Sequence, residues 1–166
     1  TASINAYLTA LDSAEVEYID GLGFVANGIM HTDDGGIAEQ MINKTGAASV
    51  KGNMVSADHT VENAVHLSEQ EEPDPIGIVY EAGVADGELC WVTITGKAQV
   101  YFIGNSVVGD FARGFVAADS GYVAGQALSE EVPSTPFATD KHFYEIGHVL
   151  ESRTGAGLAL VNLHFN

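Results

Sequence analysis

The sequence predicts a mainly β protein, with a small β-barrel or sandwich domain and an extended, partly irregular N-terminal arm. Nineteen glycines and a charged fraction of only 17% are typical of short strands joined by many turns. Apolar residues make up 46% of the 166 residues, which is enough for a sizeable core. From about residue 49 onward, short apolar segments are separated by turn residues, as in barrels and sandwiches. The length suits one domain with an arm rather than two full domains.

The predicted arm comprises residues 1–46. Ser3 is placed to cap a short helix, whose apolar side chains have the spacing of one helical face: Ile4, Tyr7, Leu8 and Leu11. Residues 16–19 are an expected strand, whereas residues 21–36 are rich in glycine and have no sustained period. An apolar helix face on an arm needs something to cover it, so these four side chains are candidate interface residues.

The predicted β-rich domain comprises residues 47–166. Its expected strands are residues 53–56, 63–67, 77–80, 89–95, 98–103, 111–117, 122–127, 144–152 and 158–165. Gly96 and Lys97 separate two of these segments closely enough to predict a tight hairpin. The last strand alternates, so its predicted core face carries Val161, Leu163 and Phe165, and its other face carries Leu160, Asn162 and His164.

Charge and composition exclude several classes of partner. Six basic residues against 23 acidic ones give a formal net charge of -17, which repels nucleic-acid backbones and anionic lipid surfaces. No segment has the length of a membrane span, and the N-terminus lacks the features of a signal peptide. We therefore expect neither a nucleic acid nor a membrane as partner. The single cysteine excludes an intrachain disulfide.

The motifs of common enzymes are missing from the sequence. Residues 21–26 fit a loose G-x-G-x-x-A pattern, but no alternation of strands and helices surrounds it. There is no G-x-S-x-G elbow, P-loop, H-E-x-x-H pair or EF-hand spacing. We therefore predict that the protein is not an enzyme, with no catalytic residues and no cofactor.

Three histidines in the C-terminal quarter, His142, His148 and His164, are candidate metal ligands. His142 and His148 would lie roughly 20 Å apart on a straight strand, at about 3.3 Å per residue. His148 and His164 can meet across a hairpin, but the sequence offers no nearby cysteine and no evident third ligand. Packing or interface roles are thus favoured, and no metal site is predicted.

Cys90 and Trp91 lie on opposite faces of one predicted strand. Cys90 shares its face with Val92 and Ile94, which indicates a buried, unreactive thiol. Trp91 shares the other face with Thr93, and two roles remain open for it: a second core contact or an anchor at a subunit interface.

Two long segments carry a family resemblance. Residues 74–87 (DPIGIVYEAGVADG) and 91–100 (WVTITGKAQV) resemble a family of tailed-bacteriophage structural proteins. The closing residues 142–148 (HFYEIGH), 150–152 (LES) and 163–166 (LHFN) resemble the end of the same proteins. The similarity spans about residues 49–166, and we identify the family as capsid decoration, or cement, proteins.

The resemblance implies a function without catalysis. Decoration proteins bind the outside of an expanded icosahedral shell and clamp neighbouring major capsid subunits together. The implied partners are the phage major capsid protein and other copies of this chain, in a homotrimer or alternatively a dimer. The implied location is the outer surface of the virion. Candidate capsid or subunit contacts are Ile4, Tyr7, Leu8, Leu11, Trp91, His142 and His148.

Two other functions remain open at this point. The chain can be a different virion component, such as the base of a head fibre or a tail part. It can also be a cupin-like small β-barrel, either a metal-dependent enzyme or a ligand-binding domain. In that case some of His142, His148 and His164 would surround a metal.

Overall fold

The computed structural model describes residues 16–19, 23–26, 28–132 and 143–165. The fold is mainly β, as predicted, and its strands are β1 (Val16–Ile19), β2 (Gly23–Ala26), β3 (Ile29–Thr32), β4 (Gly36–Asn43), β5 (Met54–Ala57), β6 (Ala64–Leu67), β7 (Pro75–Val79), β8 (Leu89–Phe102), β9 (Phe111–Arg113), β10 (Leu128–Glu130), β11 (Glu145–Val149) and β12 (Gly157–Leu163). Within these residues, no helix is long and apolar enough to cross a membrane.

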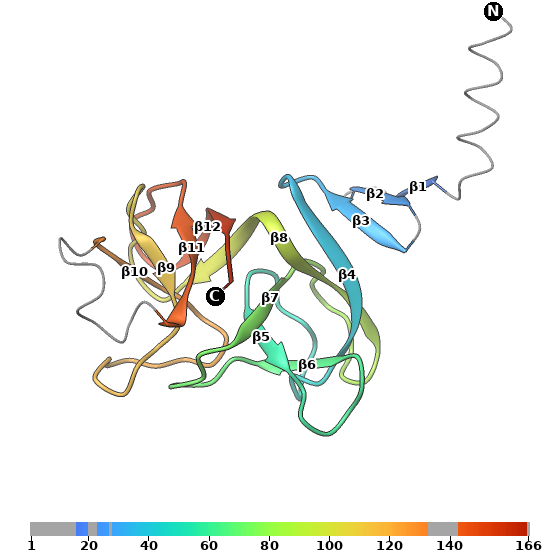
Figure 1. The fold of residues 1–166 in the computed structure, drawn as a ribbon, viewed down its shortest axis with the longest axis horizontal. Coiled ribbons are helices and arrows are strands. Elements are labelled where there is room, and N and C mark those ends of the chain that lie inside the picture. The colour runs from blue at the N-terminus through green and yellow to red at the C-terminus, as the bar shows by residue number, and fades with distance from the viewer. Residues whose placement is uncertain (1–15, 20–22, 27, 133–142, 166) are drawn as a thin grey trace, which may run out of the picture.

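Five strands close into a small barrel (Figure 1). Their order is β4, β6, β5, β7 and β8, and the ring closes because β8 also pairs with β4. The β4–β6 pair is parallel, and the other pairs are antiparallel. Closure removes the free edges that an open sheet of these strands would expose.

Strand β8 connects the barrel to a second sheet, and here the predicted hairpin at Gly96 and Lys97 is wrong. The chain continues as one strand, whose first half pairs with β4 and whose second half pairs with β12. Gly96 bends it, with φ at +81°. A side chain at Gly96 would lie 2.9 Å from the backbone of Gly35 and Gly36. The strand continues because both halves find a partner strand, which local turn chemistry does not reveal.

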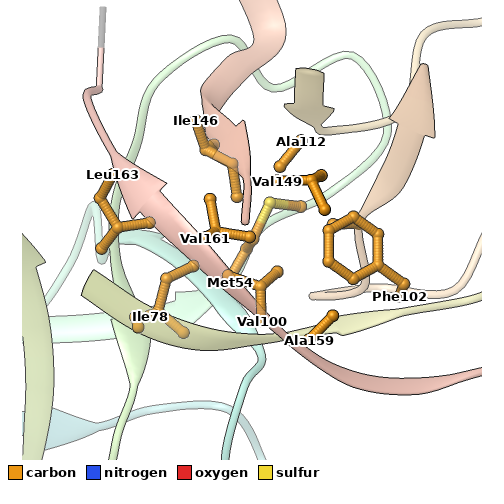
Figure 2. Packing of buried hydrophobic residues seen from close by; sticks show 12 residues of the cluster. Met54, Ile78, Val100, Phe102, Ala112, Ile146, Val149, Ala159, Val161 and Leu163 are labelled. Carbon is orange, nitrogen blue, oxygen red and sulfur yellow. The ribbon is translucent and has the colours of Figure 1, made fainter. Parts of the chain in front are cut away.

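The second sheet runs β8, β12, β11, β9 and β10 and covers the larger core (Figure 2). Val161 and Leu163 of β12 face this core, Asn162 is exposed, and Phe165 packs against the core from just beyond the strand. The predicted alternation of the last strand is therefore confirmed. Val100 and Phe102 of β8 enter the same cluster, together with Met54, Ile78, Ala98, Ala112, Ala127, Ile146, Val149 and Ala159.

Between β9 and β10 the structure differs from the predicted strands. The segment predicted as residues 111–117 contains only the short strand β9. Residues 122–127 form no strand: they contain a turn at 124–125 and an isolated bridge from Ala127 to Phe102. A turn begins after β9, in which Asp119 N donates to Val116 O and Val116 N donates to the Asp119 carboxylate. This turn ends the strand, although its residues are apolar enough to continue it.

Strands β1, β2 and β3 project from the barrel and continue as a meander into β4 (Figure 1). Strand β4 falls within the predicted arm of residues 1–46, yet seven of its residues pair with β8. The structure therefore places residues 36–43 in the barrel wall. The predicted helix over Ile4, Tyr7, Leu8 and Leu11 lies outside the described residues.

Cys90 and Trp91 occupy the two faces that the alternation predicts. Cys90 packs inside the barrel with Val92 and is 1% exposed, so the predicted burial of the thiol is confirmed. Burial, with a smaller contribution from the charge of Glu81, raises the pKa of the Cys90 thiol from 9.0 to about 11. Trp91 lies on the outer face of the barrel wall, where it packs with Met30, Ala38 and Tyr80.

The thiol of Cys90 should make stability fall at alkaline pH. The unfolded chain loses this proton near pH 9.0 and the folded chain near pH 11, so the folded state is progressively disfavoured between these values. One pKa unit corresponds to about 1.4 kcal/mol, so the expected loss is up to about 3 kcal/mol. Urea unfolding from pH 8 to 11 measures it. The Cys90→Ala variant should show a shallower decline, and parallel declines in the two proteins would contradict the assignment.

Candidate functional site

Two groups of histidine and glutamate side chains stand out within the described residues. The first, which we call the β11–β12 cluster, consists of Glu145, His148 and His164. The second, the β6 loop cluster, consists of His59, His66 and Glu72. In each group, one ligand atom per residue lies within 4.8 Å of the others.

The predicted interface residues differ in exposure, and several of them lie outside the described residues. Trp91 is only 5% exposed within the chain, which favours its role as a core contact over a role as an interface anchor. His148 is accessible, with a side chain that is 46% exposed. His142, Ile4, Tyr7, Leu8 and Leu11 lie outside the described residues.

A β-bulge in β11 creates the β11–β12 cluster. Glu145 pairs with Arg113 of β9, and Gly147 pairs with Ala112, so Ile146 is one extra residue between two consecutive pairs. In a regular strand, residues three apart point to opposite faces. The extra residue shifts this alternation, and Glu145 and His148 therefore project from the same face.

The core side of β11 confirms the shifted alternation. Ile146 and Val149 are also three residues apart, yet both are buried in the core beneath the sheet (Figure 2). Gly147 permits the bulge, because its φ is +153° and a side chain there would come within 2.1 Å of the Asn162 carbonyl oxygen. Close approach of β11 to β12 at Gly147 thus depends on glycine.

His164 reaches the cluster from the neighbouring strand. His148 pairs with Asn162 of β12, and two residues further on His164 N donates to Ile146 O, so the two imidazoles are diagonal neighbours on one face. Their ring centroids lie 4.9 Å apart. The Nε2 atoms of His164 and His148 lie 3.0 and 3.7 Å from Oε1 of Glu145.

Burial within the β11–β12 cluster is uneven. The Glu145 side chain is 1% exposed, whereas His148 and His164 are 46% and 40% exposed. The ring of Phe111 packs on His148, with centroids 5.2 Å apart. A buried carboxylate therefore lies beside two partly exposed imidazoles, and the Nε2 atom of His164 that faces it is itself buried.

Sequence reasoning brought His148 and His164 together but missed Glu145. On a regular strand, Glu145 and His148 would have faced opposite ways, so the carboxylate did not qualify as a third ligand. The available signal was Gly147, since a glycine inside a strand pattern suggests a bulge.

The β6 loop cluster lies in a shallow, acidic hollow of about 580 Å³. His66 Nε2 is 3.0 Å from Oε1 of Glu72, and Oε2 of Glu72 accepts a hydrogen bond from Glu69 N. Nearby, the Asp58 carboxylate accepts hydrogen bonds from the side chain and backbone of Thr60, which lower its pKa. In this cluster Glu72 is engaged in holding the loop together.

A buried ion-pair network lies next to the β11–β12 cluster. Both terminal nitrogens of Arg113 donate to the Asp119 carboxylate, at 2.6 and 3.0 Å, and its Nε donates to Glu130. Burial alone would lower the pKa of Arg113, but the hydrogen bonds to the two carboxylates outweigh burial and raise it. The network ties β9, β10 and the intervening loop together.

Three exposed apolar side chains lie in two hydrogen-bonded segments of the second sheet, the loop before β9 and the residue that follows β11. Val107, Val108 and Leu150 are 50%, 60% and 41% exposed. Their two segments are held together, because Gly109 N donates to Val149 O and Val149 N donates to Asp110 O. We call these three residues the Val108 patch. Apolar surface of this kind is typical of protein contacts when it is contiguous.

Comparison with known proteins gives a similarity of fold. No family model and no curated protein matches the sequence. Among solved structures, the chain is similar to the crystal structure of the N base of the head fibre protein gp8.5 of bacteriophage phi29, with a TM-score of 0.51 and 15% sequence identity. The similarity covers 76% of this chain and 92% of that chain.

Proposed function

We propose that this protein is a structural component of a phage virion, located on the outer surface of the head. The observation that carries the proposal is the fold it shares with a head-fibre base, over 92% of that chain. The resemblance of residues 74–100 and 142–166 to capsid decoration proteins supports the same class of protein from the sequence. This role requires neither catalysis nor an organic cofactor.

Two specific roles follow from these two lines of support. As a decoration protein, the chain binds the phage major capsid protein and stabilises contacts between its subunits, and it does so as a homotrimer at threefold positions. As a head-fibre base, it binds the shell and anchors the rest of the fibre, which extends outward from the head. The sequence resemblance favours the first role, and the shared fold favours the second.

The candidate contact surface combines a local apolar patch with strong negative charge. The Val108 patch offers apolar side chains that a capsid subunit can cover. Several basic side chains are paired within the chain: Lys44 with Asp86, Lys51 with Asp34, and Arg113 with its two carboxylates. With a formal net charge of -17, the chain is suited to basic positions on a shell.

Calorimetry of expanded shells, with and without the protein, tests the proposal. A protein that binds only the assembled shell raises the melting temperature of the shell by mass action, and the rise saturates with occupancy. We expect this rise and a smaller one at higher ionic strength, because added salt screens attraction between the acidic chain and basic capsid patches. Free capsid protein should melt unchanged.

Imaging of the same shells separates the two roles. Density at threefold positions with a raised melting temperature supports decoration. Density on the head with an unchanged melting temperature rules out a stabilising role and favours the fibre base. Density confined to the tail, or no binding, would contradict the proposal. Val108→Glu should weaken binding, whereas Val50→Glu, at a side chain of similar exposure, should not.

A further inference from the structure

We propose that the β11–β12 cluster is a binding site for a divalent transition metal, with zinc as the metal it suits best. The ligands are Oε1 of Glu145 and the Nε2 atoms of His148 and His164. The inference goes beyond the proposed virion role and does not depend on it.

The chemistry of the donor set favours zinc. Imidazole nitrogen and carboxylate oxygen are ordinary zinc ligands, and two histidines with one glutamate form a known three-ligand set. Calcium and magnesium instead prefer sites made of oxygen atoms.

The distances allow one ion to contact all three atoms. Zinc lies about 2.0–2.1 Å from each nitrogen or oxygen ligand, so the ligand atoms of a tetrahedral site lie about 3.3 Å apart. The Glu145 oxygen is 3.0 Å from one Nε2 and 3.7 Å from the other, which brackets this separation. All three atoms lie within 4.8 Å of one another.

The bulge gives the site a fixed frame. Glu145 and His148 are held on one face by the extra residue at Ile146, and His164 is held beside them by its backbone hydrogen bond to Ile146 O. A site on paired strands is preorganised, because its ligands do not have to be ordered when the metal binds. In the β6 loop cluster, only His66 lies on a strand, whereas His59 and Glu72 belong to loops.

Titration of chelator-treated full-length protein with Zn²⁺, followed by calorimetry, tests the site. We expect one site, and a melting temperature that rises with the Zn²⁺ concentration. His148→Ala and His164→Ala should each weaken the affinity by more than about 100-fold, beyond the loss of 10–100-fold typical of outer-shell partners. The His59→Ala variant, which alters the other cluster, should bind as the unmodified protein does.

A ligand exchange separates coordination from a structural effect. His148→Cys places a thiolate, also a zinc ligand, at the most exposed position of the site. This variant should recover the affinity that His148→Ala loses, and with Co²⁺ it should show a sulfur-to-metal charge-transfer band. Cys90 does not contribute to this band because it is buried in the barrel.

Three results would overturn the proposal. They are the absence of Zn²⁺ binding by the folded unmodified protein, equal affinity in the His148→Ala variant, and loss of binding in His59→Ala alone. Melting curves of each variant without metal identify any that fail to fold. Because His148 is exposed, His148→Ala should remain folded even if changes at Glu145 do not.

Discussion

Val161→Asp is expected to abolish folding. Val161 is 0% exposed and packs among the apolar side chains of the core beneath β12 (Figure 2). An unpaired carboxylate at this position must be desolvated without compensation, which should cost more than about 4 kcal/mol. Since typical domains are stable by only about 5–15 kcal/mol, most of the protein should be insoluble or unfolded.

The matched control for this variant is Asn162→Asp. Asn162 is the next residue on the same strand, but it is exposed on the opposite face, so the same new charge stays in water. This control should change the free energy of unfolding by less than about 0.5 kcal/mol. Circular dichroism melts of both variants provide the comparison. A soluble Val161→Asp protein with a cooperative melt would contradict the assigned orientation of β12.

Arg113→Met should destabilise the protein by about 3–5 kcal/mol, the cost of removing one partner from a buried ion pair. Arg113 is 4% exposed and contacts both Asp119 and Glu130. Without the guanidinium, the carboxylates of Asp119 and Glu130 lose the positive charge that pairs with them. Urea denaturation at neutral pH measures the loss.

A more exposed ion pair provides the control for burial. Lys44 and Asp86 are 3.2 Å apart, but both side chains are about one third exposed. Lys44→Met should therefore cost much less than Arg113→Met, because water screens the pair. The triple variant Arg113→Met, Asp119→Leu, Glu130→Met should regain part of the lost stability, since it removes all three charges of the network. Equal losses for Lys44→Met and Arg113→Met would contradict the role of burial.

Features that depend on neighbouring residues could be predicted from the amino-acid sequence. Glycine content and short apolar segments predicted the β class, and period-two alternation placed Val161, Leu163 and Cys90 on buried faces. These predictions succeeded because successive side chains on any strand point to opposite faces, whichever strand lies beside it.

Tertiary structure decided everything that depends on which strands pair. The continuation of β8 through Gly96 follows from partner strands on both sides of the bend, β4 and β12, which are far apart in sequence. Strand β4 joined the barrel for the same reason, although its segment looked like part of an arm. Local turn propensity carries no information about such distant partners.

The β11–β12 cluster likewise depends partly on local sequence and partly on strand pairing. The sequence brought His148 and His164 together across a predicted hairpin, but it offered no evident third ligand. Only the pairing of β11 with β9 inserts the extra residue that brings Glu145 and His148 together. A one-residue shift in register reverses the face of every side chain beyond it, so the third ligand depends on the pairing of β11 rather than on its sequence.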